Sequence, residues 1–297
     1  MHLAIVGHIA IDTIVLKGSE VSSLGGPPCY AGLTAKRLDS EVTLVTKIGA
    51  DFPDEYLLWL ARNGINLAKN SKSLNSKTTR FKINVRKEGR SLQLTSRCKE
   101  IEASQLNGLD VDGAILSPIA GEIPKEVSDA IVSKGITTFL DPQGYLRKFD
   151  KKGFCSLGKL SLSKLPRTSI IKVDPEEGYI LTGTSNLHDI ALKLRKHGFE
   201  NAIVTNGAKN MIVASEKSVV ELKVPKVNVN DTTGLGDILA GSFMATYLKT
   251  NDFLSSACAG VACASSASKG KGINKIDQIR DWEDIAEQVK EGMKKLA

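Results

Sequence analysis

The chain has 297 residues, of which 41% are hydrophobic and 25% charged, and its formal net charge is +7. No apolar run reaches the roughly 20 residues of a membrane span, and the lysines are spread without a recognisable nucleic-acid module, so we expect neither a membrane nor a nucleic-acid partner. The five cysteines form no CxxC pair and the first residues lack a secretion-signal pattern, which argues against a zinc site or disulfide framework and favours a cytoplasmic protein.

Short apolar runs alternate with helical patterns along the chain. We expect strands at 3–7, 42–48, 114–116, 137–140, 170–173 and 201–205. We expect helices at 28–38, 56–63, 125–134, 187–198, 237–249, 254–269 and 281–295. This alternation predicts an α/β protein with a mostly parallel, doubly wound sheet, whose ligands gather beyond the carboxyl ends of the strands. Asp141, Asp174 and Asn206 each follow one of these strands.

One segment departs from the α/β rhythm. Residues 78–98 alternate apolar and polar side chains around a turn at Glu88 and Gly89, which is typical of a hairpin. We expect this hairpin to project as a small sheet beside the core, joined by residues 11–16. Such a lid would cover a substrate or pair with a second subunit, giving a homodimer. The alternative is an antiparallel extension of the main sheet.

Residues 231–237 read DTTGLGD and an apolar helical pattern follows at once. The glycines permit a sharp turn, and exposed N–H groups at a helix start form an anion site. A carboxylate there would repel the anion, so we interpret Asp237 as a base that accepts a proton beside a phosphate. Backbone N–H groups of residues 233–236 would stabilise the transferred oxygens. The alternative is an ordinary helix with an acidic first turn. The catalytic candidates are Asp237, Gly234, Leu235 and Gly236.

The sequence has no P-loop, no GxGxxG after a strand, no protein-kinase signature and no GxSxG elbow. Its motifs instead resemble, in order, those of the ribokinase-like, pfkB-type carbohydrate kinases. DTTGLGDILAGSF at 231–243 resembles the C-terminal signature of that family, GGPPCYA at 25–31 falls at its Gly-Gly motif, and KIGADFP at 47–53 is similar to a third stretch. The resemblance implies a single domain over 1–297, with a three-layer α/β/α ribokinase-like fold and a small β lid from strands near 11–24 and 78–98.

The resemblance also implies residues that bind the acceptor. Asp12 corresponds to the aspartate that binds substrate hydroxyls, and Gly25 and Gly26 belong to the substrate loop. DPQGYLR at 141–147 resembles a segment of the inositol-kinase-like branch, which implies substrate contacts from Gln143 and Arg147. A turn aspartate and a turn after a strand are the alternative interpretations.

On the donor side the resemblance implies ATP and Mg²⁺. VTNGAKN at 204–210 is similar to the nucleotide-facing segment of the family. Asp174 and Glu177 fall at the acidic motif that organises Mg²⁺ through water, although an acidic helix cap would give the same pattern. The nucleotide-binding candidates are Thr205, Asn206, Gly207, Thr232, Thr233 and, from a loop expected to border the adenine, Asn274.

These observations predict an ATP-dependent phosphotransferase that acts on a hydroxyl of a sugar or cyclic polyol, with an inositol-like acceptor favoured by residues 141–147. Two alternatives stay open at this point. One is a nucleoside kinase on the same fold, which the 5% aromatic content disfavours mildly. The other is a regulator that binds sugar or nucleotide without turnover.

Overall fold

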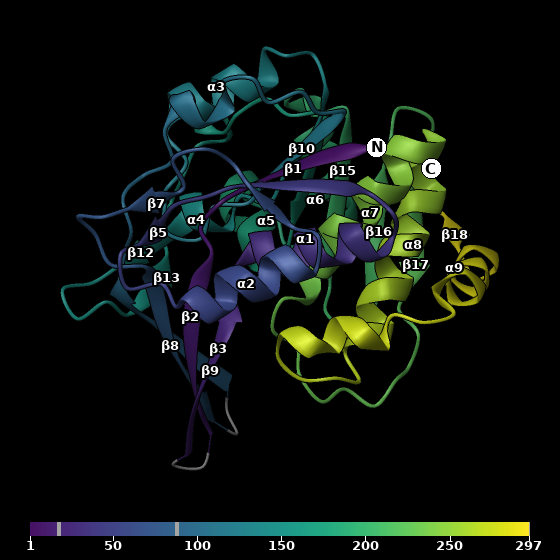
Figure 1. Cartoon of the computed structure of the whole chain (residues 1–297). Helices are drawn as coiled ribbons and strands as arrows, with labels where there is room; N and C mark the ends of the chain where they lie inside the picture. The colour runs from purple at the N-terminus through teal and green to yellow at the C-terminus, as the bar shows by residue number, and fades with distance from the viewer. Residues whose placement is uncertain (17–18, 87–88, 297) are drawn as a thin grey trace.

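The computed structural model describes residues 1–16, 19–86 and 89–296 and has a ten-stranded sheet at its centre, in the order β18-β17-β16-β15-β14-β11-β10-β1-β4-β6 (Figure 1). Every pairing from β15 to β6 is parallel, and β16, β17 and β18 add antiparallel strands at one edge. The strands are β1 (His2–Val6), β4 (Glu41–Val45), β6 (Asn66–Leu67), β10 (Gly113–Leu116), β11 (Thr137–Leu140), β14 (Ile170–Val173), β15 (Asn201–Thr205), β16 (Asn210–Ala214), β17 (Val219–Lys223) and β18 (Lys294–Lys295).

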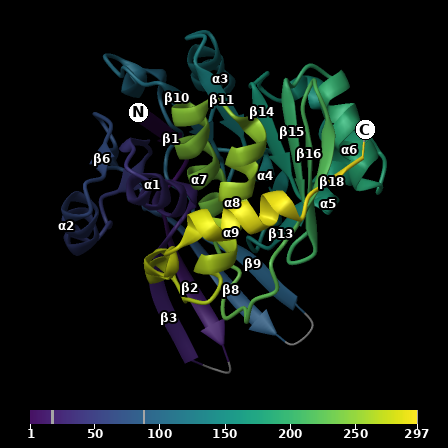
Figure 2. The same cartoon turned by 90° about the vertical axis from the view of Figure 1, so that its right-hand side faces the viewer.

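Helices cover both faces of this sheet, which confirms the three-layer α/β/α prediction. Successive residues of a strand point to opposite faces, so Leu3 and Ile5 enter one core cluster while Ala4 and Val6 enter the other. Figure 2 shows α7, α8 and α9 in front of the sheet. The first cluster includes α1 (Pro27–Arg37), α2 (Asp54–Arg62), α7 (Leu235–Thr250), α8 (Phe253–Ala267) and α9 (Trp282–Glu291). The second includes α3 (Lys125–Val132), α5 (Pro175–Thr182) and α6 (Leu187–Lys196).

A separate four-stranded sheet projects from the body of the molecule (Figures 1 and 2). It consists of β3 (Ser19–Gly25), β2 (Ala10–Leu16), β8 (Thr79–Arg86) and β9 (Gly89–Ser96), in that order. The predicted hairpin is therefore β8–β9, paired through β8 to β2 and not to the main sheet. Phe81 and Ile83 pack with Ala10, Ile119 and Ala120 in a third cluster that anchors the small sheet to the core. Of the predicted turn, Glu88 lies outside the described residues.

Several predicted elements differ from the structure. The strand expected at 42–48 divides into β4 and β5 (Ile48–Gly49), because β5 pairs with β7 (Lys72–Ser73) in its own two-stranded sheet. The helix expected at 281–295 ends at Glu291, and Lys294–Lys295 form β18 on the free edge of β17. The β16–β17 hairpin was not predicted, and neither were α5 and several short elements. These are α4 (Gln143–Leu146), β12 (Arg147–Phe149), β13 (Cys155–Leu157), η1 (Ala103–Leu106), η2 (Leu162–Lys164) and η3 (Ile273–Gln278).

Within the described residues, no helix combines the length and the apolar character that a membrane crossing needs. The homodimer expected through the small sheet stays a prediction. In that sheet β3 is an edge strand, and its Val21 side chain is 61% exposed.

Candidate active site

A cavity of about 120 Å³ lies between the small sheet and the start of α7. Its wall brings together seven of the predicted residues, although they are separated by up to 225 positions (Asp12 to Asp237) in the chain. Its apolar wall comes from the small sheet and the loops beside it. The predicted residues that line it are Asp12, Gly26, Gln143, Arg147, Thr233, Gly234 and Asp237, and their neighbours include Tyr30, Phe81, Ile83, Leu92 and Ile119.

Asp12 is held in this cavity by the pairing of β2 with β3. The two strands place Gly25 so close that a Cβ atom at Gly25 would lie 2.1 Å from Oδ2 of Asp12. The following Gly26 has φ 87° and precedes α1, and a Cβ atom there would lie 2.4 Å from the carbonyl oxygen of His8. Gly26 is therefore required by its positive φ and by the close backbone, whereas a larger residue at Gly25 would displace the Asp12 carboxylate. The exposed fraction of Asp12 is only 6%.

Gln143 and Arg147 form the second polar group of the cavity. They lie one turn apart at the ends of α4, and Nη2 of Arg147 donates to Oε1 of Gln143 at 2.6 Å. Nη1 of Arg147 donates to the carbonyl oxygen of Ile119 at 3.3 Å. The guanidinium is thus fixed by two acceptors while the pair presents an amide and a cation to the cavity.

Asp237 lies in the first turn of α7 and completes the polar wall. Burial raises the pKa of Asp237 to about 7, and the negative charges of Asp141 and Asp12 act in the same direction. The cations of Lys172 and Arg147 oppose this shift. A carboxyl group that titrates near neutral pH is suited to accept a proton from an alcohol.

A buried ion pair lies behind Asp237. Nζ of Lys172, on β14, is 2.5 Å from Oδ2 of Asp141, which follows β11, and both side chains are almost fully buried. Lys172 also faces the first turn of α7, since a Cβ atom at Gly236 would lie 3.0 Å from its Nζ. The pair places a buried cation where parallel strands end and α7 begins.

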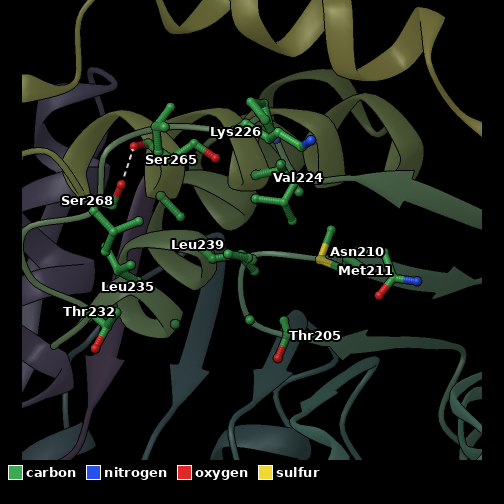
Figure 3. Close-up of a pocket in the computed structure, with 18 of the residues that line it drawn as sticks. Thr205, Asn210, Met211, Val224, Lys226, Thr232, Leu235, Leu239, Ser265 and Ser268 are labelled. Carbon is green, nitrogen blue, oxygen red and sulfur yellow. Dashed lines mark hydrogen bonds between the residues drawn. The ribbon is translucent and has the colours of Figure 1, made fainter. Parts of the chain in front are cut away.

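A second and larger cavity of about 370 Å³ lies on the other side of the same loop. Figure 3 shows Leu239, Met211 and Val224 around one space, with Thr205 and Thr232 at its border. Most of its wall is apolar, including Val227, Val261 and Ala264. The predicted residues that line it are Thr205, Gly207, Thr232, Leu235 and Gly236.

The loop at 231–237 separates the two cavities. Thr233, Gly234 and Asp237 line the small cavity, while Thr232, Leu235 and Gly236 line the large one. Gly234 has φ 73°, and a Cβ atom there would lie 2.6 Å from the ring of Tyr30. The N–H group of Thr233 already donates to Oδ1 of Asp231 at 2.8 Å, which removes it from the predicted set of anion donors.

Asp174 and Glu177 form a reciprocal capping box at the start of α5. Oδ1 of Asp174 accepts from the N–H of Glu177, and Oε2 of Glu177 accepts from the N–H of Asp174. Burial and the charge of Asp141 raise the pKa of Glu177, and Lys172 opposes them. Among the described residues no cluster of three or more acidic, histidine or cysteine side chains is arranged to hold a metal directly.

Three predicted nucleotide contacts are not brought into the large cavity, and one of them, Thr233, lines the small cavity instead. The amide of Asn206 donates to Oδ1 of Asn210, so Asn206 supports a cavity residue without lining the cavity itself. Asn274 lines a different pocket of about 180 Å³, together with Arg37 and Trp59.

The model of the pfkB family carbohydrate kinases matches residues 2–278. The chain belongs to this family. It is a sugar or nucleoside kinase with a ribokinase-like fold.

The kinase has relatives with different acceptors. It is 26% identical over 262 residues to a cytidine kinase of Thermococcus kodakarensis, which covers 83% of this chain and 88% of the relative. It is 24% identical over 317 residues to a deoxyribokinase of Salmonella typhi, which covers 97% of this chain and the whole relative.

Solved structures share the fold of the kinase. One is a pyrophosphate-dependent kinase of the ribokinase family complexed with a pyrophosphate analog and myo-inositol, with a TM-score of 0.82, 19% identity and coverage of 93% of this chain and 98% of that one. Another is Arabidopsis thaliana ribokinase complexed with ribose and ATP, with a TM-score of 0.74, 18% identity and coverage of 97% and 98%.

Sequence reasoning missed three residues around the site of the kinase. Lys172 had a usable signal, because a charged residue inside the four-residue apolar strand IIKV must find a buried partner. The Tyr30 ring against Gly234 and the Lys275 side chain beside Asp231 had none, since both contacts depend on how distant loops pack.

Proposed function

We propose that the kinase transfers the γ-phosphoryl group of ATP to a hydroxyl of a sugar or cyclic polyol. The observation that carries this proposal is the pair of cavities that share the loop at 231–237. The small cavity is about the size of one sugar ring and its wall carries hydrogen-bonding groups. The large cavity is mostly apolar. Acceptor and donor would meet at the loop from opposite sides.

The acceptor hydroxyl would lie against Asp237. Asp12, Gln143 and Arg147 converge on the same cavity, so the other hydroxyls of a polyol would find a carboxylate, an amide and a guanidinium. The raised pKa of Asp237 lets its carboxylate take the proton as the oxygen attacks phosphorus. The bond from that oxygen to the γ-phosphorus forms while the bond to the leaving ADP breaks.

The donor would occupy the large cavity, with a nucleobase against Met211, Val224 and Val261. N–H groups in the first turn of a helix have no intrahelical acceptor. The N–H of Leu235 already donates to the carbonyl oxygen of Thr232, so those of Gly234 and Gly236 would face the transferred oxygens. Lys172 borders both this cavity and Gly236, and its cation would offset phosphate charge.

Asp174 and Glu177 fit a hydrated Mg²⁺, because the capping box uses one oxygen of each carboxylate and Mg²⁺ keeps several waters. When bound, the ion would neutralise part of the charge of the polyphosphate. The residues of this chain would hold it only through water.

An acceptor and donor panel tests the proposal. Myo-inositol, ribose, deoxyribose and hexoses are each combined with ATP or pyrophosphate, and product is followed by phosphate-specific mass spectrometry, with Asp237→Asn beside the parent. We expect turnover with ATP and a polyol or sugar, and a loss of at least 10²-fold in kcat for Asp237→Asn. Turnover with pyrophosphate but not with ATP would overturn the assignment of ATP as the donor. An active Asp237→Asn variant would overturn the assignment of Asp237 as the base.

A nucleoside is the second candidate acceptor. The relative named a cytidine kinase supports it, and so do the rings of Tyr30 and Phe81 in the wall of the small cavity. Thermal stabilisation by cytidine or adenosine, compared with myo-inositol and ribose, separates the two classes. A larger rise in Tm with the nucleosides would indicate that the acceptor is a nucleoside and not a polyol.

A further inference from the structure

Lys275 is a fully buried lysine that the proposed chemistry does not use. It lies in η3 (Ile273–Gln278), between α8 and α9, and its exposed fraction is 0%. Burial of an ammonium group carries a large desolvation cost unless the charge is paired and hydrogen-bonded. The partners of this group therefore indicate what it does.

The partners of Lys275 lie on the loop that separates the two cavities. Its Nζ donates to the carbonyl oxygens of Asp231 at 3.0 Å and of Thr233 at 2.7 Å. It is also 2.9 Å from Oδ2 of the Asp231 carboxylate. A single ammonium group thus bridges main chain and side chain of the DTTG turn from a segment more than 40 residues away.

Asp231 extends this bridge in two directions. Its Oδ1 accepts the N–H of Thr233 at 2.8 Å, and its Oδ2 accepts the N–H of Gly272 at 3.0 Å. Both the N–H and the C=O of Thr233 are therefore held, which fixes the peptide planes on either side of it. The next residue, Gly234, begins the turn into α7 and is confined on its other side by the ring of Tyr30.

We infer that Lys275 is a positioning residue for phosphoryl transfer: a tethered cation that, with Asp231, holds the turn before α7 so that the N–H groups that follow this turn at the start of α7 face the phosphates. The inference rests on the proposed function. The pair is balanced in charge, so it orders the turn without placing a net negative charge beside an anion. Loss of the ammonium alone leaves the Asp231 carboxylate without this cation and two carbonyl groups without their donor, and both effects oppose a bound polyphosphate.

The test compares ligands that share a nucleoside but differ in phosphates. Lys275→Met keeps most of the length of the side chain and removes its charge, and Lys271→Met, at an exposed lysine of the same loop, is the matched control. Binding of adenosine, of the non-hydrolysable analogue AMPPNP and of pyrophosphate is measured by titration calorimetry. We expect Lys275→Met to weaken the binding of AMPPNP and of pyrophosphate at least tenfold and to change the affinity for adenosine by less than twofold. The variant should also have a lower kcat. Lys271→Met should match the parent.

Equal weakening of adenosine and AMPPNP would show a merely structural role and overturn the inference, as would unchanged affinity for all three ligands. If the parent bound pyrophosphate but neither adenosine nor AMPPNP, the assignment of ATP as the donor would be overturned. The role of Lys275 would then be tested by the effect of Lys275→Met on pyrophosphate affinity alone.

The double variant Lys275→Met/Asp231→Asn tests the charge balance. Removing both charges should recover part of the AMPPNP affinity that Lys275→Met loses, so the two changes should be non-additive. Additive losses would overturn the paired-charge role. If Lys275→Met does not fold, Lys275→Gln, which removes the charge but keeps a donor for the carbonyl groups, takes its place and is expected to show the same selective loss for AMPPNP over adenosine; equal losses would count against the inference.

Discussion

The pKa of Asp237 depends on its burial and on the charges that surround it. Burial and the carboxylates of Asp141 and Asp12 favour its neutral form, while Lys172 and Arg147 favour the ionised one. The outcome is a pKa of about 7, so small changes in these neighbours move the ionisation across the neutral range. The reactivity of the site is therefore expected to depend on residues that do not contact the acceptor.

Asp141→Asn should shift the pH profile of the reaction. The change removes a negative charge near Asp237 and releases Lys172 from its ion pair, and both effects lower the pKa of Asp237. Because the base must be ionised, kcat/KM rises with pH through this pKa, near 7 in the parent. We expect the acidic limb to move by at least half a pH unit to lower pH in the variant. An acidic limb at the same pH in parent and variant would show that Asp141 does not influence the pKa of Asp237.

Asp237→Asn should stabilise the fold at alkaline pH. The folded pKa of about 7 lies above the ordinary value of 3.8, so the contribution of this group is fully present below about pH 4 and is lost as pH rises through 7. Asparagine does not ionise. We expect the variant to exceed the parent by about 1–3 kcal/mol at pH 8, after allowance for partial exposure, and by less at pH 5. Urea unfolding at both pH values measures this difference, and a gain that did not change with pH would contradict it.

At the scale of elements, the site depends on how strands and loops constrain one another. The β2–β3 pairing places Gly25 against Asp12, and the start of α7 places Gly234 against Tyr30. The large cavity uses β16 and the residues after β17 for its apolar wall, although these strands gave no clear pattern in the sequence.

Gly25→Ala should impair acceptor binding. The added Cβ atom would lie 2.1 Å from Oδ2 of Asp12, so the carboxylate must move from its position in the small cavity. We expect KM for the acceptor to rise at least tenfold while KM for the donor changes by less than twofold. Ser22→Ala, at an exposed site on the same strand, is the control. A variant with equal changes in both constants would indicate a general loss of structure.

The sequence predicted the residues of the site better than it predicted their partners. Asp237 was predicted from a glycine turn before a helix, whereas Asp12, Gln143 and Arg147 were predicted from motifs that resemble those of the family. The structure brings all four residues to one cavity. Asp141 and Lys172 are 31 positions apart in the chain, and no local sequence pattern indicates that they form an ion pair. Asn274 was placed in the donor site by its position in the chain, but its loop turns toward Arg37.

The whole molecule joins an α/β/α body to a four-stranded sheet, with the small cavity where they meet. Phe81, Ile83 and Leu92 of that sheet line the cavity directly. An acceptor therefore contacts both parts at once, and its binding is expected to restrict the small sheet relative to the body.

Acceptor binding should protect the small sheet from amide exchange. We expect slower deuterium uptake in β8 and β9 when acceptor is added, because Phe81 and Leu92 would then pack on the ligand. Uptake in α3, whose residues line neither cavity, serves as the internal control. Equal protection of α3 would indicate global stabilisation instead of closure.

The position of the loop at 231–237 between two separate cavities also has a stereochemical consequence. If the two substrates approach it from opposite sides, the phosphoryl group passes once, directly between two oxygens, with no covalent enzyme intermediate. A donor made chiral at its γ-phosphorus would then yield a product of inverted configuration, and initial-rate plots for the two substrates would intersect instead of running parallel.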